Sequence, residues 1–144
     1  MRRNPGYPAT RYHPSPLVDF SVRTERERLS PPALRAFFNI MTRWQVRDED
    51  ARALLGGVTN GPFYEMKKHP ERVLEVDRLL RISYLVGIFK ALNVLYSDAL
   101  ADAWMRQPNT NAIFAGQTPL AYLTAGGLPA MQVVRRLLDA RRAG

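Results

Sequence analysis

Cysteine is absent from this chain of 144 residues, and histidine occurs only twice. The lack of cysteine excludes disulfides, thiolate nucleophiles and cysteine-based zinc sites together. The two histidines are His13, in a proline-rich stretch, and His69, in a Lys-Lys-His-Pro turn, and neither has the spacing of a metal site. A glycine-rich phosphate loop is missing too, because LLGGVTNG follows a helical pattern rather than a strand. The sequence therefore predicts a binding protein rather than an enzyme, with no metal and no cofactor.

Long apolar runs are scarce as well. The longest nearly apolar stretch covers residues 82–96 and is interrupted by Lys90 and Asn93, so it is too short to cross a bilayer. Two arginines stand near the N-terminus without an apolar stretch behind them, which does not fit a secretory signal. We therefore expect a cytoplasmic protein without membrane contact.

Positive charge, by contrast, is in excess: 21 Lys and Arg stand against 13 Asp and Glu, a formal net charge of +8. This balance favours a polyanionic partner such as DNA, or an acidic protein surface, although a merely basic soluble protein has the same composition. Asp98 and Asp102 are four residues apart and in principle share a metal or a proton. Acids are common in the first turn of a helix, so we interpret this pair as a solvated face.

The apolar periodicity predicts an all-α fold around one long central helix. Ser30, followed by two prolines, is expected to cap a first helix that reaches Trp44. The segment 71–95 is expected to be the central helix, because its second half is apolar on nearly every side. The other helices are expected over 48–55, 59–67, 97–104, a short stretch from 119, and 129–142 after a break at 125–127.

Residues 1–29 have no helical period and carry prolines at positions 5, 8, 14 and 16. Proline blocks helices and sheet ladders, so this segment is expected to be an extended basic arm. Together with the large apolar side chains Phe37, Phe38 and Trp44, the arm favours a homodimer.

Residues 48–68 have the layout of a helix-turn-helix. Ala53 is expected where the two helices cross, Gly57 in the turn, and Phe63 packed back on the first helix. Any helix that ends in glycine and is followed by threonine has a similar pattern. Two features oppose DNA binding: Gly61 and Pro62 occupy reading positions, and the acids at 48–50 bring negative charge toward the DNA backbone. If the second helix reads DNA, its polar contacts are Thr59, Asn60, Tyr64, Lys67 and Lys68, with the lysines on phosphates and Asn60 on a base edge.

The C-terminal third carries a more specific pattern over about fifty residues from Leu92 onward. Its elements, in order, are Trp104, Pro108, Asn109, Phe114, Gly116, Pro119, Leu120, Gly126 and a final amphipathic helix. This pattern resembles the toxin-binding domain of Xre/MbcA/ParS antitoxins, placed behind an Xre-like helix-turn-helix. The resemblance divides the chain into an arm (1–29), a helix-turn-helix region (30–69) and a small helical toxin-binding domain (70–144).

The resemblance implies a partner, namely a Res-type toxin with an ADP-ribosyltransferase-like fold that degrades NAD. An antitoxin of this kind binds and silences the toxin, and often binds operator DNA to repress the shared operon. The alternative is a plain helix-turn-helix transcription regulator whose C-terminal domain dimerises or senses a ligand.

The residues of the pattern also have structural interpretations. Trp104 is expected to be a core anchor, Pro108 and Asn109 to end a helix, and Gly116 and Gly126 to be positions that tolerate no side chain. In the last helix, Met131, Val134 and Leu138 are expected to face the core. The expected toxin contacts are Arg135, Arg136, Arg141, Arg142, Ala143 and Gly144. A slim tail ending in a carboxylate suggests a plug at the pyrophosphate position of the NAD pocket; a frayed helix end and occlusion by the whole domain are the alternatives.

Overall fold

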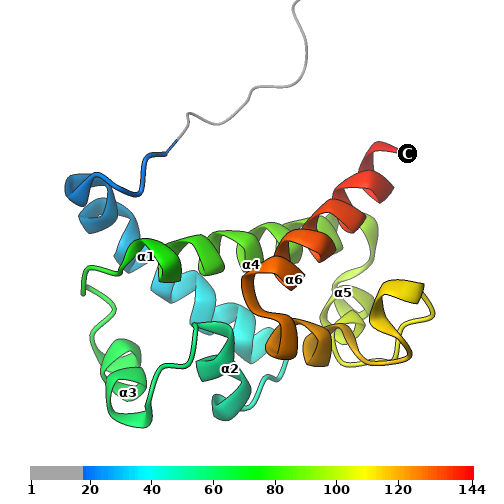
Figure 1. Ribbon diagram of the computed structural model, residues 1–144, viewed down its shortest axis with the longest axis horizontal. Coiled ribbons are helices and arrows are strands. Elements are labelled where there is room, and N and C mark those ends of the chain that lie inside the picture. Colours follow the sequence, from blue (N-terminus) through cyan, green and yellow to red (C-terminus); the bar gives the residue numbers. More distant parts are fainter. Residues whose placement is uncertain (1–17) are drawn as a thin grey trace, which may run out of the picture.

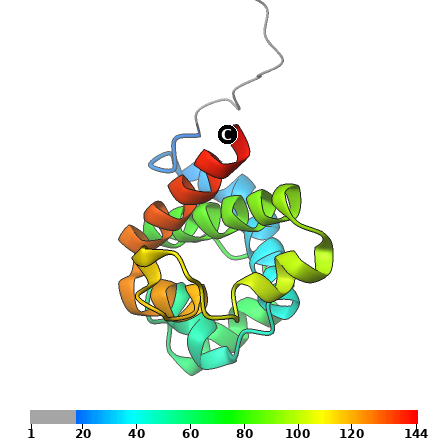
Figure 2. The same cartoon turned by 90° about the vertical axis from the view of Figure 1, so that its right-hand side faces the viewer.

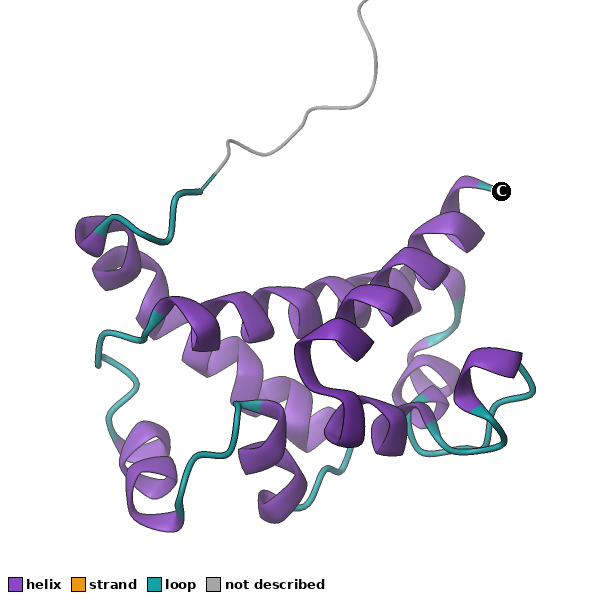
Figure 3. Cartoon of the chain, in the orientation of Figure 1, coloured by secondary structure: helices purple, strands orange, loops and turns teal. Residues whose placement is uncertain are grey.

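The structure is a computed structural model that describes residues 18–144. Residues 1–17, which include most of the expected arm, lie outside the described part. The elements are α1 (Arg23–Arg43), α2 (Asp48–Leu54), α3 (Asn60–Lys68), α4 (Val76–Leu95), α5 (Asp98–Trp104), the 3-10 helix η1 (Ala112–Phe114) and α6 (Pro119–Ala143) (Figure 1). Residues 18–144 contain no strand (Figure 3), so the all-α prediction is confirmed.

Helix α4 is the axis of the fold, as its apolar composition predicts. It packs against α1, α5 and α6, and α6 also packs against α2 (Figures 1 and 2). Its residues Leu85, Ile88 and Leu92 are fully buried at helical spacing, and one hydrophobic cluster extends from Leu34 in α1 to Leu138 in α6. The helix begins at Val76, five residues later than expected.

Helix α1 begins at Arg23, so the prediction that Ser30 caps it is wrong, and residues 23–29 are helical rather than extended. Ser30 lies buried in the middle of the helix, where its hydroxyl donates to the carbonyl of Arg26 and accepts from the backbone N–H of Leu74 at 2.8 Å. The two prolines that follow remove two helical donors, whose carbonyl partners belong to Glu27 and Arg28. Both residues are exposed, so water can satisfy those carbonyls.

Helices α2 and α3 lie at the expected positions in the sequence, and α3 packs against α1. The turn between them uses Gly56 and Gly57, whose φ angles of 97° and 89° suit glycine, and Phe63 is fully buried. The small residue buried in α2 is Ala51, whereas Ala53 is exposed, so the prediction that Ala53 marks the crossing is wrong. The error is one of helix phase, because two alanines flank Arg52.

Helix α6 consists of two arms joined at Gly127, whose φ of 63° and ψ of −144° are not helical. The predicted break at 125–127 is therefore confirmed. The first arm (119–126) lies beside α2, and the second arm (128–143) lies against α4 (Figure 1). The kink lets one segment cover two different helices of the core.

Candidate functional site

The inner face of the second arm of α6 belongs to the core. Met131, Val134 and Leu138 have no exposed surface and pack within the cluster around α4. This placement confirms the expectation from their spacing. Partner contacts must therefore come from the other faces of the arm.

Arg135 turns back onto the protein. Its guanidinium lies over Gly87 of α4, so closely that a Cβ at position 87 would stand 1.6 Å from Nη1. Its Nε donates to the two carboxylate oxygens of Asp139 at 3.0 and 3.3 Å. One of the four arginines expected to contact a toxin is thus occupied at the crossing of α4 and α6.

The remaining arginines differ in how far they are engaged. Arg141 Nη1 donates to the hydroxyl of Tyr96 at 3.3 Å, and Arg142 lies 3.8 Å from Asp139. Arg136 is exposed and forms no ion pair within residues 18–144. The helix continues to its last residues, with the N–H of Gly144 bonded to the carbonyl of Ala140 at 3.0 Å. This last turn projects beyond the body of the fold (Figures 1 and 2).

The motif residues mainly shape the turn region between α5 and α6. Phe114 is fully buried and makes edge-to-face contacts with Trp104 and Tyr122, at ring distances of 5.8 and 5.3 Å. Trp104 itself is only half-buried, so it closes the edge of the core rather than filling its centre. Gly116 has a φ of 81°, as expected for a position that favours glycine.

The polar and proline positions of the motif hold the same loop. The Asn109 side chain accepts from the N–H of Asn111 at 2.8 Å, and its backbone N–H donates to Gln117 at 3.3 Å. Pro108 is exposed in the turn after α5, and Pro119 is buried in the first turn of α6. These residues specify the fold of the segment.

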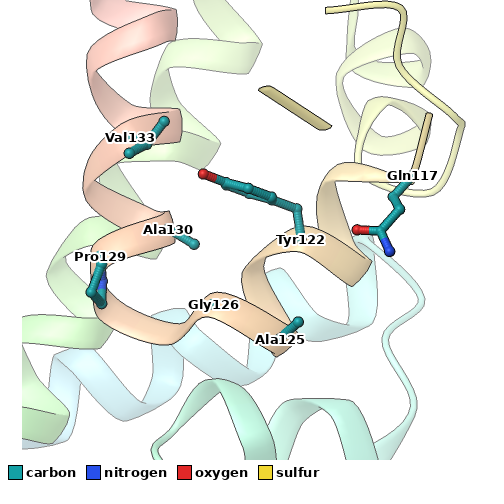
Figure 4. A pocket seen from close by; sticks show the side chains of 7 residues that line it. All are labelled: Gln117, Tyr122, Ala125, Gly126, Pro129, Ala130 and Val133. Atoms are coloured by element: carbon teal, nitrogen blue, oxygen red, sulfur yellow. The ribbon is translucent and has the colours of Figure 1, made fainter. Parts of the chain in front are cut away.

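A groove of about 330 Å³ lies at the kink of α6 (Figure 4). A Cβ at Gly126 would stand 2.6 Å from the Cβ of Ala130, so glycine at 126 lets the two arms approach. The groove depends on how the two arms are placed in space, and sequence reasoning did not find it; the run Gly126-Gly127-Leu128-Pro129 is its only signal in the sequence. The groove is lined by Gln117, Tyr122, Ala125, Gly126, Pro129, Ala130 and Val133.

This groove and the projecting last turn both lie in a segment that matches a known protein family. Residues 90–144 match the family described as the antitoxin Xre/MbcA/ParS C-terminal toxin-binding domain. This segment of the chain is therefore a domain of the antitoxin toxin-binding family. It is also 36% identical over 115 residues to the uncharacterized protein y4oB of Sinorhizobium fredii (strain NBRC 101917 / NGR234), a match that covers 79% of this chain and 87% of y4oB. No solved structure matches the chain significantly.

The helix pair α2–α3 lies outside the matched antitoxin domain. Thr59, Asn60 and Lys68 are exposed, and Thr59 precedes α3 without a capping hydrogen bond from its side chain. The other two expected DNA contacts are tied to the first turn of α2, where Asp48 accepts from the Tyr64 hydroxyl and from Lys67 Nζ, both at 3.1 Å.

The Asp48 contact is electrostatically stable at neutral pH. The hydrogen bond from Lys67, supported by that from Tyr64, lowers the pKa of Asp48 below its usual 3.8. The Lys67 ammonium also lies 5.1 Å from the ring centre of Phe63. An acidic residue of the chain itself, Asp48, thus binds two of the groups that were expected to contact DNA.

The acidic pair and His69 form no metal site. Asp102 pairs with Arg43 at 2.9 Å, whereas Asp98 is exposed. His69 Nδ1 lies 3.2 Å from a carboxylate oxygen of Glu71. Within residues 18–144 no three His, Cys, Asp or Glu side chains gather as a metal site would require. The helices of residues 18–144 include none with the length and apolar character that crossing a bilayer requires.

Proposed function

We propose that this chain is a cytoplasmic, non-enzymatic antitoxin that binds and neutralises a Res-type, NAD-degrading toxin. The observation that carries the proposal is the match of residues 90–144 to a toxin-binding domain, combined with the exposed last turn of α6. In this proposal the region 70–144 holds the toxin, although its helices share one hydrophobic cluster with α1 to α3.

The toxin contacts are the outward-facing end of α6. Arg136, Arg142, Ala143 and Gly144 are exposed and ready to meet a partner. Arg141 needs only to leave a hydrogen bond with Tyr96. Arg135 contributes differently, by fixing the arm against α4. Ala143 and Gly144 make the last turn slim enough to enter a narrow cleft, and the arginines around it suit an acidic rim.

Operator binding is the second part of the proposal, and α3 is its candidate reader within the region 30–69. Asn60 and Lys68 are exposed and free to approach a groove and a phosphate. Tyr64 and Lys67 join them only when Asp48 releases them. The antitoxin is therefore expected to bind DNA weakly until that contact opens.

A homodimer completes the proposal, because helix-turn-helix units usually read half-sites in pairs. The surface that suits a second copy is a groove of about 420 Å³ between α1 and α4. Among the described residues Lys90 is the only charged one that lines it, and Phe20, Leu29, Ala33 and Val86 are among its apolar walls. Two copies can therefore bury the same apolar face against each other. A chain that stays monomeric in light scattering at high concentration contradicts the dimer.

The experiment that tests the proposal is coexpression. The Res-type toxin that the proposal requires as partner is induced in a bacterial host with and without this chain, and growth and cellular NAD are followed. Arrest of growth and loss of NAD, both prevented by the antitoxin, support the proposal. The alternative, a plain transcription regulator with a dimerising or ligand-sensing domain, predicts no protection together with binding to operator DNA.

A further inference from the structure

We propose that the groove at the kink of α6 receives one large apolar side chain of the toxin, and that an acidic residue of the toxin beside it meets Arg136. This inference rests on the proposed function and identifies the surface through which it acts. The groove lies wholly within the matched toxin-binding segment, between Gln117 and Val133.

The groove is preformed. Its shape depends on the absence of a side chain at Gly126, where a Cβ would stand 2.6 Å from that of Ala130, and on the positive φ of Gly127. Ala125 and Pro129 at its rim are exposed and too short to fold over the opening. Glycine, alanine and proline lose no side-chain rotamer freedom on binding. Four of the seven lining residues are glycine, alanine or proline and therefore need no ordering when a partner side chain enters, which lowers the entropic cost of association.

The lining selects an apolar group with at most one polar atom. Among residues 18–144 no charged side chain lines the groove, so this part of the chain offers a phosphate no counter-charge there. Tyr122 points from the first arm across to Val133 on the second arm (Figure 4), and its hydroxyl makes no hydrogen bond within residues 18–144. The volume of about 330 Å³ lies at the small end of the roughly 300–1,000 Å³ typical of ligand pockets. A single anchoring side chain fits this space, as in the pockets that dominate protein interfaces.

The outward face of the second arm continues the groove as a strip. Pro129, Val133, Arg136 and Ala140 follow one another at intervals of four, three and four residues, which places them on one face. Arg136 is the charged residue of this strip and forms no ion pair in the described part of the chain. The strip ends at the last turn, the part that the proposed function assigns to the toxin.

Charge distinguishes the toxin from the other occupants. A second copy of a chain with a net charge of +8 offers Arg136 few acids. The one acid of α6, Asp139, already lies beside Arg135 and Arg142. DNA offers acidic phosphates but no apolar side chain for the groove. A protein that presents an apolar anchor next to a carboxylate satisfies both features.

The test uses the full chain and the purified Res-type toxin that the proposed function requires. Ala125→Trp fills the groove from its rim, and Ala99→Trp makes the same change at an exposed position of α5 in the same domain. Calorimetry should show toxin affinity reduced about tenfold or more by Ala125→Trp and less than about threefold by Ala99→Trp. Thermal unfolding of both variants, free of toxin, should match the parent.

A charge reversal keeps the inference testable if Ala125→Trp fails to fold. Arg136→Glu should weaken toxin binding about tenfold or more, with a smaller effect at high salt, whereas Arg106→Glu, an exposed arginine after α5, should not. If folded Ala125→Trp and Arg136→Glu both bind the toxin with the affinity of the parent, the groove is not the toxin-binding surface. The proposed function would then still stand. A parent chain that does not bind the toxin overturns both. If isolated Ala125→Trp has a lower mass than the parent in light scattering, the groove binds a second copy of the chain instead of the toxin. That result also overturns the inference.

Discussion

Arg135 occupies the space that a side chain at Gly87 would need. Its guanidinium lies across α4 at the point where the second arm of α6 crosses it, and Asp139 holds its Nε at 3.0 Å. The absence of a side chain at position 87 is therefore a condition for the way in which α6 sits on the central helix. The arginines of α6 thus have different places: Arg135 packs against α4 within the fold, whereas Arg136 lies exposed on the surface.

The first prediction is a thermodynamic coupling between these two residues. Alanine favours a helix interior over glycine by roughly 0.5–1 kcal/mol. In an Arg135→Ala background, Gly87→Ala should therefore stabilise the chain by about that amount. In the parent, the same substitution should gain less or destabilise, because Arg135 must leave its place. Urea unfolding of the four proteins gives the coupling energy, and additive effects would contradict the contact.

A second prediction concerns Ser30. Its hydroxyl satisfies the buried N–H of Leu74 and fixes the turn before α4 against α1. Ser30→Ala leaves that donor unpaired and should cost about 1–3 kcal/mol in the free energy of unfolding. Ser83→Ala, at an exposed position of α4, is the matched control and should cost far less. Equal losses for the two serines would show that the Ser30 contact does not stabilise the fold.

A third prediction addresses DNA binding. Asp48→Asn removes the carboxylate that accepts from Lys67 and Tyr64. It should strengthen binding to DNA of any sequence and increase the salt slope by about one, because Lys67 gains a phosphate. Glu49→Gln changes the net charge equally in the same turn, at an exposed residue, and should have a smaller effect. Equal effects of the two variants would indicate a general charge effect and remove α3 from the interface.

A fourth prediction separates tail insertion from occlusion by the whole domain. Deleting residues 141–144 should weaken assembly with the toxin, because Arg141 and Arg142 are lost. At concentrations that saturate the complex, NAD consumption should nevertheless resume if the last turn enters the NAD pocket. Replacing both Arg141 and Arg142 by alanine keeps the length and removes the charge, so it should weaken assembly while the bound complex stays inhibited. Full inhibition by the truncated chain would show that bulk, not the tail, blocks the toxin.

The parts of this fold that the sequence could predict are those decided locally. The pair Gly56-Gly57 ends α2, and Gly127 breaks α6, because each residue acts within its own turn. The start of α1 could not be predicted in the same way. Ser30 before two prolines is typical of a helix start, but its hydroxyl bonds to Leu74, which lies 44 residues away in the sequence.

In the candidate site, too, the features that depend on neighbouring residues could be predicted, and those that depend on distant residues could not. The inner face of α6 followed from its periodicity, whereas the role of Arg135 depends on Gly87 in another helix. Lys67 was expected to be free for DNA, but it meets Asp48 at a separation of 19 residues. The groove arises from the angle between the two arms of α6, which no local pattern specifies.

The central claim, that this antitoxin silences an NAD-degrading toxin by direct binding, is tested most directly with purified components. A fixed amount of the purified Res-type toxin that the proposed function requires is titrated with this chain while NAD consumption is recorded. The account predicts that consumption falls in proportion to added antitoxin and stops at a fixed molar ratio, the ratio found in the isolated complex. Undiminished NAD consumption in the presence of excess antitoxin would contradict it.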